Sequence, residues 1–593
     1  MATMAPPQAR PLEKPKSYDP ESVSNLLREA VPGSVVSASA SGVVLQASKL
    51  LDAVSFLKNT PELGYNYLNQ VTGVDWPDRF EVVYNLTSIP RGGPSLPLKV
   101  NLTDKANPVV PSLMPLYRGA DQQEREVYDL MGIRFAGHPN LRRIFMWEAF
   151  EGHPLRKDYK EPFYEQEHKP FDSRWDQGHH VIAEDRNPWH DNVNYPPNFD
   201  PVSFAPPRDI VRSIPAVSES WKGPSLRTQP IIVNLGPQHP STHGVFRLRV
   251  VIEGETIMAV EPIYGYMHRN HEKIGERNTY IMNVPFCDRL DYLAGMQMEH
   301  GYVRAVEKLM GVKPPERTEY IRVITDELTR IQSHLFGGIG QVYSDLGAFF
   351  TPIVWGIEER ELILDLFEAA SGSRMMNNYM RFGGVWRDLP DGFLEVTKEL
   401  AENRLPRVAD EFESYLVHNE IFDVRARNVG VLSPEVAINL SQSGPQLRAS
   451  GVPYDLRRSD PYSIYDRFDF DVITGTHGDV YDRMACRIQE VRESCKILSQ
   501  AVKQIPSGEI QTGKKNYQVR VPKGDVYAHI EAARGEFGWY VVSDGSPNPY
   551  RYHVRAGDFI NLGAIEQLAV GHKIGDLVAI VGAVDIIMGS VDR

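Results

Sequence analysis

Cysteine is scarce in this sequence. Only Cys287, Cys486 and Cys495 occur, and no two of them form a Cys-x-x-Cys pair. A disulfide framework is therefore not expected. An iron–sulfur cluster takes more cysteine thiolates than one such chain offers, so the sequence excludes a complete cluster held by this chain alone. We interpret the three thiols as buried structural side chains.

Long apolar runs are missing as well. The best candidate for a membrane span, residues 336–357, is interrupted by Gln341, Ser344 and Asp345, whereas a spanning helix needs about 20 mostly apolar residues. The first 16 residues are rich in Pro and Ala and lack the apolar region of a signal peptide. We expect residues 1–17 to form a disordered tail, and the cytoplasm is the default compartment.

Positive charge is not in excess. Acidic residues outnumber basic ones by 77 to 64, which gives a net charge of -13. Nucleic acids and anionic membrane surfaces attract a cationic face, so neither is an expected direct partner. The 593 residues also exceed what one core accommodates, because single cores stop growing near about 250–300 residues. Two or more domains are expected.

Residues 18–160 have the pattern of an α/β domain. A helix is predicted at 20–30, and alternating or β-branched segments predict strands at 42–46, 80–86 and 98–102. Residues 161–229 follow, dense in Pro, Asp, Asn and Trp, and are interpreted as an extended linker over a surface. The spacing of the linker histidines matches no metal-ligand pattern, so we expect no metal there; they are His179, His180 and His190.

Residues 230–593 predict a larger, helix-rich α+β domain. It opens with two strands, 231–235 and 246–252, around a short connection. Apolar residues at helical spacing over 321–335 predict one buried helix face. Further predicted elements are helices at 362–370 and 478–500, and strands at 527–531, 539–543 and 578–584.

The connection between the first two strands of this domain is the most informative segment. Residues 236–244 read Gly-Pro-Gln-His-Pro-Ser-Thr-His-Gly, which offers two imidazoles, His239 and His243. Imidazole titrates near neutral pH and suits proton delivery. The alternative is that both histidines are ordinary turn residues.

Two further segments carry candidate polar groups. Residues 287–292 are expected to open a helix with Asp288 at its start, and Tyr292 is then either a core aromatic or a functional phenol. Asp345 ends the periodic helix among apolar neighbours, where a carboxylate is costly unless paired. It is either a cap or the hydrogen-bond partner of a functional histidine.

A charged stripe lies on the helix before Asp345. Asp326, Arg330 and His334 follow one another at a spacing of four residues. Such residues are neighbours on one helix face. We interpret the stripe as a structural ion-pair face rather than a site.

Several motifs stand in a characteristic order and spacing. In the first domain they are Glu-Arg-Glu-Val-Tyr-Asp at 124–129, Gly-His-Pro at 137–139 and Gly-His-Pro-Leu-Arg-Lys-Asp-Tyr at 152–159. In the second they are 236–244, 267–273, 289–292, 374–385, 447–451, 478–483, 533–536 and 585–593. With these motifs the chain resembles the fused C and D subunits of bacterial respiratory NADH:quinone oxidoreductase (complex I). The resemblance implies a 30-kDa-subunit-like α/β domain and a hydrogenase-large-subunit-like α+β domain.

Some positions depart from the family pattern. Gln122 and Gln123 replace a usual aromatic pair, Met131 replaces a usual Phe, and Gly557-Asp558 replaces a usual Pro-Ser. We expect these changes to lie outside the quinone site. They should affect local packing and partner contacts.

The resemblance implies a role in quinone reduction by a proton-pumping complex. Tyr292 and His243 would bind the quinone headgroup, and Asp345 would pair with His243. Electrons from NADH would arrive through FMN and iron–sulfur clusters in partner subunits, the last cluster lying in the B-type subunit. Other implied partners are the I-type ferredoxin-like, G-type, and H- and A-type membrane subunits. The chain itself would bind no cofactor and would sit at the cytoplasmic face of the inner membrane.

Two other functions compete with this one. The second domain also resembles the large subunit of nickel–iron hydrogenases, but the regions where those enzymes carry metal-binding Cys-x-x-Cys pairs, 239–269 and 585–593, contain no cysteine. Thiolates are the ligands such a metal needs, so hydrogenase activity is excluded. The remaining alternative is a purely structural subunit that docks an electron-carrying partner.

Overall fold

The computed structural model describes residues 18–148, 150–160, 230–239, 242–346, 351–513 and 519–593. The predicted tail at 1–17, the predicted linker at 161–229 and its three histidines lie outside these residues. Within the described part, no helix is long and apolar enough to cross a membrane.

The first part of the chain is a mixed five-stranded sheet with helices, in the order β1-β2-β5-β4-β3. Only the β2–β5 pair is parallel. The strands are β1 Val35–Ser39, β2 Gly42–Leu45, β3 Tyr67–Asp75, β4 Phe80–Thr87 and β5 Leu96–Leu102, with a separate pair β6 Val109–Pro111 and β7 Arg134–Ala136. The helices are α1 Pro20–Ala30, α2 Leu50–Asn59 and α3 Ala120–Met131. The predicted helix and strands of this part are confirmed.

The second part begins with a three-stranded antiparallel sheet, β8 Ile231–Leu235, β9 Arg247–Glu253 and β10 Thr256–Ile263. Its first helices are α4 His271–Arg277, α5 Val284–Cys287, α6 Gly295–Met310, α7 Glu316–Ser333, α8 Val342–Asp345 and α9 Thr351–Ser371. A π-helical stretch, His334–Gln341, joins α7 to α8. The short pair β11 Met380–Arg381 and β12 Gly384–Val385 follows.

The rest of the second part adds a helical layer and a third sheet. The helices are α10 Phe393–Glu399, α11 Leu405–Phe412, α12 Glu420–Ala426, α13 Pro434–Asn439, α14 Gly444–Ala449, α15 Leu456–Ser459 and α16 Val480–Gln504. The sheet is β13 Gly524–Ala532, β14 Gly535–Ser543 and β15 Arg551–Arg555, and the chain ends with α17 Gly557–Leu562, α18 Ile565–Ala569, α19 Ile574–Val584 and α20 Met588–Asp592. Asp479 begins α16 by accepting a hydrogen bond from the Asp482 N–H.

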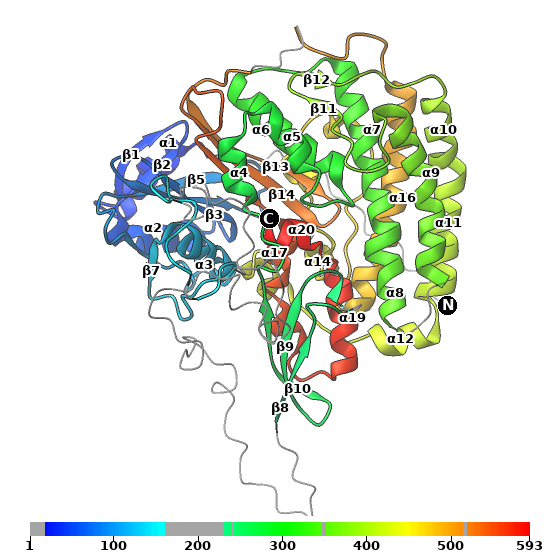
Figure 1. The fold of residues 1–593 in the computed structure, drawn as a ribbon, viewed down its shortest axis with the longest axis horizontal. Coiled ribbons are helices and arrows are strands. Elements are labelled where there is room, and N and C mark those ends of the chain that lie inside the picture. Colours follow the sequence, from blue (N-terminus) through cyan, green and yellow to red (C-terminus); the bar gives the residue numbers. More distant parts are fainter. Residues whose placement is uncertain (1–17, 149, 161–229, 240–241, 347–350, 514–518) are drawn as a thin grey trace, which may run out of the picture.

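The two parts share a buried boundary. In Figure 1 the first part (blue to cyan) lies beside β13 and β14 (orange), and the long helices α7, α9 and α16 lie beyond them. Every residue of β3 and β4 is buried, because β13–β15 supplies a second cover over their sheet. Val74 and Val83 pack there against Tyr540, and Lys99 Nζ lies 2.8 Å from the Asp525 carboxylate.

One predicted element is wrong, and another begins later than predicted. Residues 578–584, predicted as a strand, belong to helix α19, which packs against α16 and α8. A short apolar, β-branched run does not distinguish a buried strand from a buried helix. The helix expected to open at 287–292 exists, but its predicted start is wrong: α5 ends at Cys287, a turn follows, and α6 begins at Gly295.

Candidate functional site

His243 lies in the connection between β8 and β9. Its backbone adopts the left-handed conformation, with φ of 54°, and its side chain is 4% exposed. Gly236 at the other end of the loop has φ of 84°, and a Cβ there would lie 1.8 Å from the Phe246 carbonyl oxygen. Only glycine fits this position.

Asp345 is the last residue of α8, and it meets His243. The Asp345 carboxylate forms a short hydrogen bond with His243 Nε2, and its side chain is 9% exposed. Helix α19 leaves room for this pair at Gly582, where a Cβ would lie 2.9 Å from Asp345 Oδ2 and 3.5 Å from His243 Cε1. The structure therefore brings together two of the three residues singled out in the sequence.

Tyr292 lies in the turn before α6 and is half-buried. Burial and then the charge of Asp291 raise the pKa of the Tyr292 phenol. Nearby, Arg269 donates to the Arg289 carbonyl oxygen at 2.8 Å. Among the described residues, no hydrogen bond joins Tyr292 to His243.

One short segment, the start of α20, touches both arms of the site. A Cβ on Gly244, next to His243, would lie 2.9 Å from Met588 Cγ. A Cβ on Gly589 would lie 2.5 Å from the Leu290 carbonyl oxygen and 3.5 Å from Tyr292 Cδ1. Residues 588–589 thus form a wall with the histidine loop on one side and the Tyr292 turn on the other.

A buried charge cluster lies behind this wall. Arg534 is 1% exposed and its guanidinium lies 2.7 Å from Asp291, next to Tyr292, and 3.1 Å from Asp585. Arg487 lies 3.7 Å from the other oxygen of Asp585. Burial opposes the charge of Asp585, but Arg534 and then Arg487 hold its pKa below the usual range. Asp291, Arg534 and Asp585 stand in motifs of the sequence, but nothing local shows that they meet.

Asp558 lies beside this charge cluster, and the expectation that positions 557–558 lie outside the quinone site stays a prediction. It is fully buried, and its charge is among the causes that raise the pKa of Tyr292. Burial and then the charge of Asp291 raise the pKa of Asp558 itself to about 6. The departure at this position was visible in the sequence, but its place in space was not.

The stripe on α7 is structural, as expected. Asp326 accepts from His300 Nδ1 at 2.6 Å, and His334 Nε2 lies 2.9 Å from Glu490. Arg330 donates to the carbonyl oxygen of Glu531 at 2.6 Å. All three side chains are paired within the core and are not part of the site.

The three cysteines are free and buried, as expected. Within the described part, one group of side chains has metal-like spacing: Glu126, Glu272 and His553 offer ligand atoms within 4.8 Å of one another. Arg551 lies 2.7 Å from Glu272, and Arg593 lies 2.8 Å from Glu126. The two guanidinium groups already balance both carboxylates, so a cation has little to gain there.

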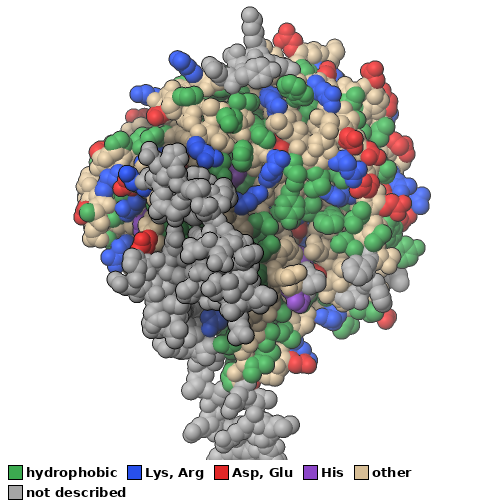
Figure 2. All heavy atoms as spheres, in the orientation of Figure 1, with side chains coloured by type: hydrophobic (Ala, Val, Ile, Leu, Met, Phe, Trp, Pro, Cys, Tyr) green, Lys and Arg blue, Asp and Glu red, His purple; other side chains and the backbone are tan. Residues whose placement is uncertain are grey.

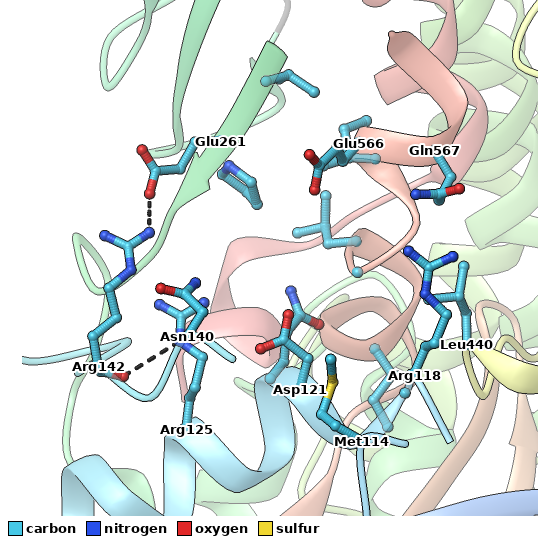
Figure 3. A pocket seen from close by; sticks show the side chains of 18 residues that line it. Met114, Arg118, Asp121, Arg125, Asn140, Arg142, Glu261, Leu440, Glu566 and Gln567 are labelled. Atoms are coloured by element: carbon cyan, nitrogen blue, oxygen red, sulfur yellow. Dashed lines mark hydrogen bonds and ion pairs between the residues drawn. The ribbon is translucent and has the colours of Figure 1, made fainter. Parts of the chain in front are cut away.

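A cavity in the described part of the chain lies elsewhere. It holds about 120 Å³ between α3, β10 and α18. Figure 3 shows Arg142 paired with Glu261 on one side of the cavity, and Glu566 lies on the other side. Gln122, which replaces a usual aromatic residue, lines this cavity and bonds to the Tyr264 hydroxyl. His243, Tyr292 and Asp345 are not among its lining residues.

Comparison with known proteins decides the family. Residues 345–593 match the model of the respiratory-chain NADH dehydrogenase 49 Kd subunit. The chain is 53% identical over 375 residues to the first of the NADH-quinone oxidoreductase D subunits of Roseiflexus sp., covering 62% of this chain and 100% of the relative. This chain belongs to the 49 Kd subunit family. The corresponding D subunit of Dehalococcoides mccartyi is likewise 53% identical over 369 residues, with 62% and 100% covered.

The first part matches a second family. Residues 43–165 match the model of the respiratory-chain NADH dehydrogenase 30 Kd subunit. The chain therefore joins a 30 Kd and a 49 Kd subunit in one polypeptide. This confirms the fused C/D resemblance and, with it, the mixed α/β composition.

Proposed function

We propose that this chain is the fused C/D subunit of an NADH:quinone oxidoreductase and that His243, Asp345 and Tyr292 form part of its quinone-reduction site. The observation that carries the proposal is the His243–Asp345 pair, which shares the wall at residues 588–589 with Tyr292. Quinone is the substrate. FMN and iron–sulfur clusters belong to partner subunits.

The geometry suits a two-ended grip on a quinone ring. Asp345 binds Nε2 of His243 and so fixes the orientation of the imidazole. The Tyr292 hydroxyl is a second donor. Each hydrogen bond to a carbonyl contributes about 0.5–3 kcal/mol to binding. Their larger effect falls on reduction, when negative charge builds on the quinone oxygens.

Partner subunits complete the assembly in this proposal. The B-type cluster-bearing subunit supplies electrons, the I-type ferredoxin-like and G-type subunits are further partners, and the H- and A-type subunits hold the chain at the cytoplasmic face of the membrane. Exposed apolar side chains on the projecting β8–β10 sheet support docking: Ile231 is 55% exposed, Ile232 43% and Met258 38%. Figure 2 shows hydrophobic side chains over this lower end and the middle of the same face.

Point variants in the whole complex test the proposal. Tyr292→Phe keeps the ring and removes the hydroxyl, and His243→Ala removes the imidazole. Both should assemble and keep NADH-to-ferricyanide electron flow while quinone turnover falls. If both variants assemble and reduce quinone at normal rates, the chain serves for docking rather than as part of the quinone site.

A further inference from the structure

The wall at residues 588–589 is held by one buried carboxylate. Asp558 Oδ2 accepts the Ile587 N–H at 3.1 Å and also the Ser590 hydroxyl. Its Oδ1 accepts the Phe559 N–H at 3.0 Å. Ile587 is the N-cap residue of α20. Asp558 therefore fastens both ends of the segment that carries Met588 and Gly589.

This fastening bears on the two arms of the site together. Met588 limits how closely the His243 loop approaches, through Gly244, and Gly589 packs on the backbone of the Tyr292 turn. Met588 and Gly589 are adjacent in the chain, and each contacts one arm of the site. A shift of α20 therefore changes the distance of both arms from this segment. Hydrogen-bonding and catalytic geometry are sensitive to displacements of this kind.

Asp558 also adds a third carboxyl group to a cluster that contains two arginines. Arg534 and Arg487 offset Asp291 and Asp585. Asp558 is the third carboxyl beside them, and the groups facing it are Asp291, Arg534, Ser590 and the Ile587 N–H. An ionised Asp558 thus adds a negative charge that opposes ionisation of the Tyr292 phenol.

We propose that Asp558 is a positioning residue of the quinone site, which sets the separation of Tyr292 from His243 by anchoring α20 and sets the charge that Tyr292 experiences. This inference rests on the proposed function. It assigns a role to a position where the family usually carries serine. The side chain acts through α20 and through Tyr292, not by contact with the quinone.

Asp558→Asn and Asp558→Ser separate the anchor from the charge. Asn keeps an oxygen for the Ile587 N–H and Ser590 but carries no charge. We expect quinone KM close to normal and loss of the change in quinone turnover between about pH 5 and 7 that the titration of Asp558 imposes. Ser is too short to reach Ile587. We expect a rise of about 5- to 10-fold in the KM for a short-chain quinone analogue, from the lost hydrogen bonds.

The double variant Asp558→Ser with Ser590→Asp provides a rescue. Residue 590 is the third residue of α20, from which a carboxylate can reach back to the Ile587 N–H as in a capping box. The swap restores the carboxyl–hydroxyl pair in reverse order, so KM should return toward normal. Asp391→Asn, at an exposed position, is the control and should change nothing.

The outcomes are distinguishable in the assembled complex, with NADH-to-ferricyanide flow as the internal reference. If Tyr292→Phe lowers quinone turnover but Asp558→Ser and Asp558→Asn leave KM and the pH profile unchanged, Asp558 has no positioning role. If Asp558→Ser does not assemble, the double variant and Asp558→Asn decide. The inference is overturned if Asp558→Ser with Ser590→Asp does not restore assembly and a normal KM, and Asp558→Asn keeps the pH profile of the parent. If Tyr292→Phe and His243→Ala are both normal, the proposed function fails first.

Discussion

At the scale of single residues, the site depends on carboxylates that are buried and each matched to a donor. Asp345 is matched to His243, and Asp291 to Arg534. Breaking a buried pair by removing one partner is costly, because the other group is left desolvated. Substitutions that keep shape and remove charge therefore report function better than truncations.

Asp345→Asn should lower quinone turnover by about 3- to 30-fold, the effect of losing one or two hydrogen bonds. The amide keeps the shape of the side chain but removes the carboxylate that holds His243. The effect should be milder than that of His243→Ala. The NADH:quinone rate of the assembled complex, normalised to ferricyanide reduction, measures it. An Asn variant more impaired than His243→Ala would mean that Asp345 does not act through the imidazole.

Two adjacent buried carboxyl groups, Asp288 and Glu299, predict a pH effect on stability. Asp288 and Glu299 are buried and adjacent; burial is the first cause of raised pKa values for both, with that of Asp288 at about 6. Asp288 accepts the Asn378 N–H, and Glu299 accepts the N–H groups of Tyr379 and Met380. The unpaired oxygens, Asp288 Oδ1 and Glu299 Oε1, suit a shared proton.

Because the folded-state pKa of Asp288 lies above its unfolded value of 3.8, its stabilisation is complete below about pH 4 and is lost as the pH rises through about 6. Asp288→Asn imitates the protonated acid. The variant should lose less thermal stability than the parent between pH 5 and 8, as followed by scanning calorimetry of the complex. Equal losses in both proteins would show that the pair does not hold a proton.

At the scale of elements, α19 determines whether the His243–Asp345 pair can form. The helix carries two glycines with different surroundings. A Cβ on Gly582 would lie 2.9 Å from Asp345 Oδ2, whereas the nearest atom to a Cβ on Gly575 is Arg425 Nη2 at 3.7 Å. Alanine favours a helix over glycine by about 1 kcal/mol, so helix propensity alone stabilises both variants.

Gly582→Ala should therefore lower quinone turnover by displacing Asp345, while Gly575→Ala should leave it unchanged. The two substitutions add the same methyl group to the same helix. Quinone reductase rates of the two complexes, compared side by side, provide the test. Equal rates would show that the carboxylate moves aside without consequence.

At the scale of the whole molecule, the two fused parts are joined by buried polar contacts. Glu536 on β14 accepts from Asn69 on β3 at 2.9 Å, from the Tyr527 hydroxyl at 2.8 Å and from His529 at 2.8 Å. Burial opposes its charge, but Arg555 and the hydrogen bonds outweigh it, and the pKa of Glu536 falls to about 2. The hydrogen bond between Glu536 and Asn69, which we call the Glu536 clamp, therefore helps to hold the first part against the second.

Glu536→Gln should destabilise the junction by about 3 kcal/mol, because it leaves Arg555 without its charge partner. The pKa is lowered, so the stabilisation from Glu536 is present above its ordinary value of 4.5 and is lost as the pH falls toward 2. Acid unfolding of the variant should therefore lack part of the parent's pH dependence. Glu435→Gln, at an exposed position, is the control. A variant with unchanged acid unfolding would contradict the clamp.

The local sequence pattern by itself determined those helices and strands for which residue periodicity and flanking residues indicate the same element. Helix α1, strands β4 and β8, and the apolar face of α7 followed from residue spacing and type. The resemblance, carried by motifs, brought His243 and Asp345 together as the structure does. Residues 578–584 were beyond local pattern, because an apolar run fits either a strand or a buried helix.

Only the tertiary structure decided which distant groups share a site. Asp558, Asp585 and Arg534 come from three elements near the C-terminal end and meet Asp291 from the turn before α6. The full burial of β3 and β4 likewise depends on β13–β15, more than 400 residues later in the chain. Period and propensity are properties of neighbours along the chain, whereas burial, charge pairing and pKa are set by whatever packs alongside in space.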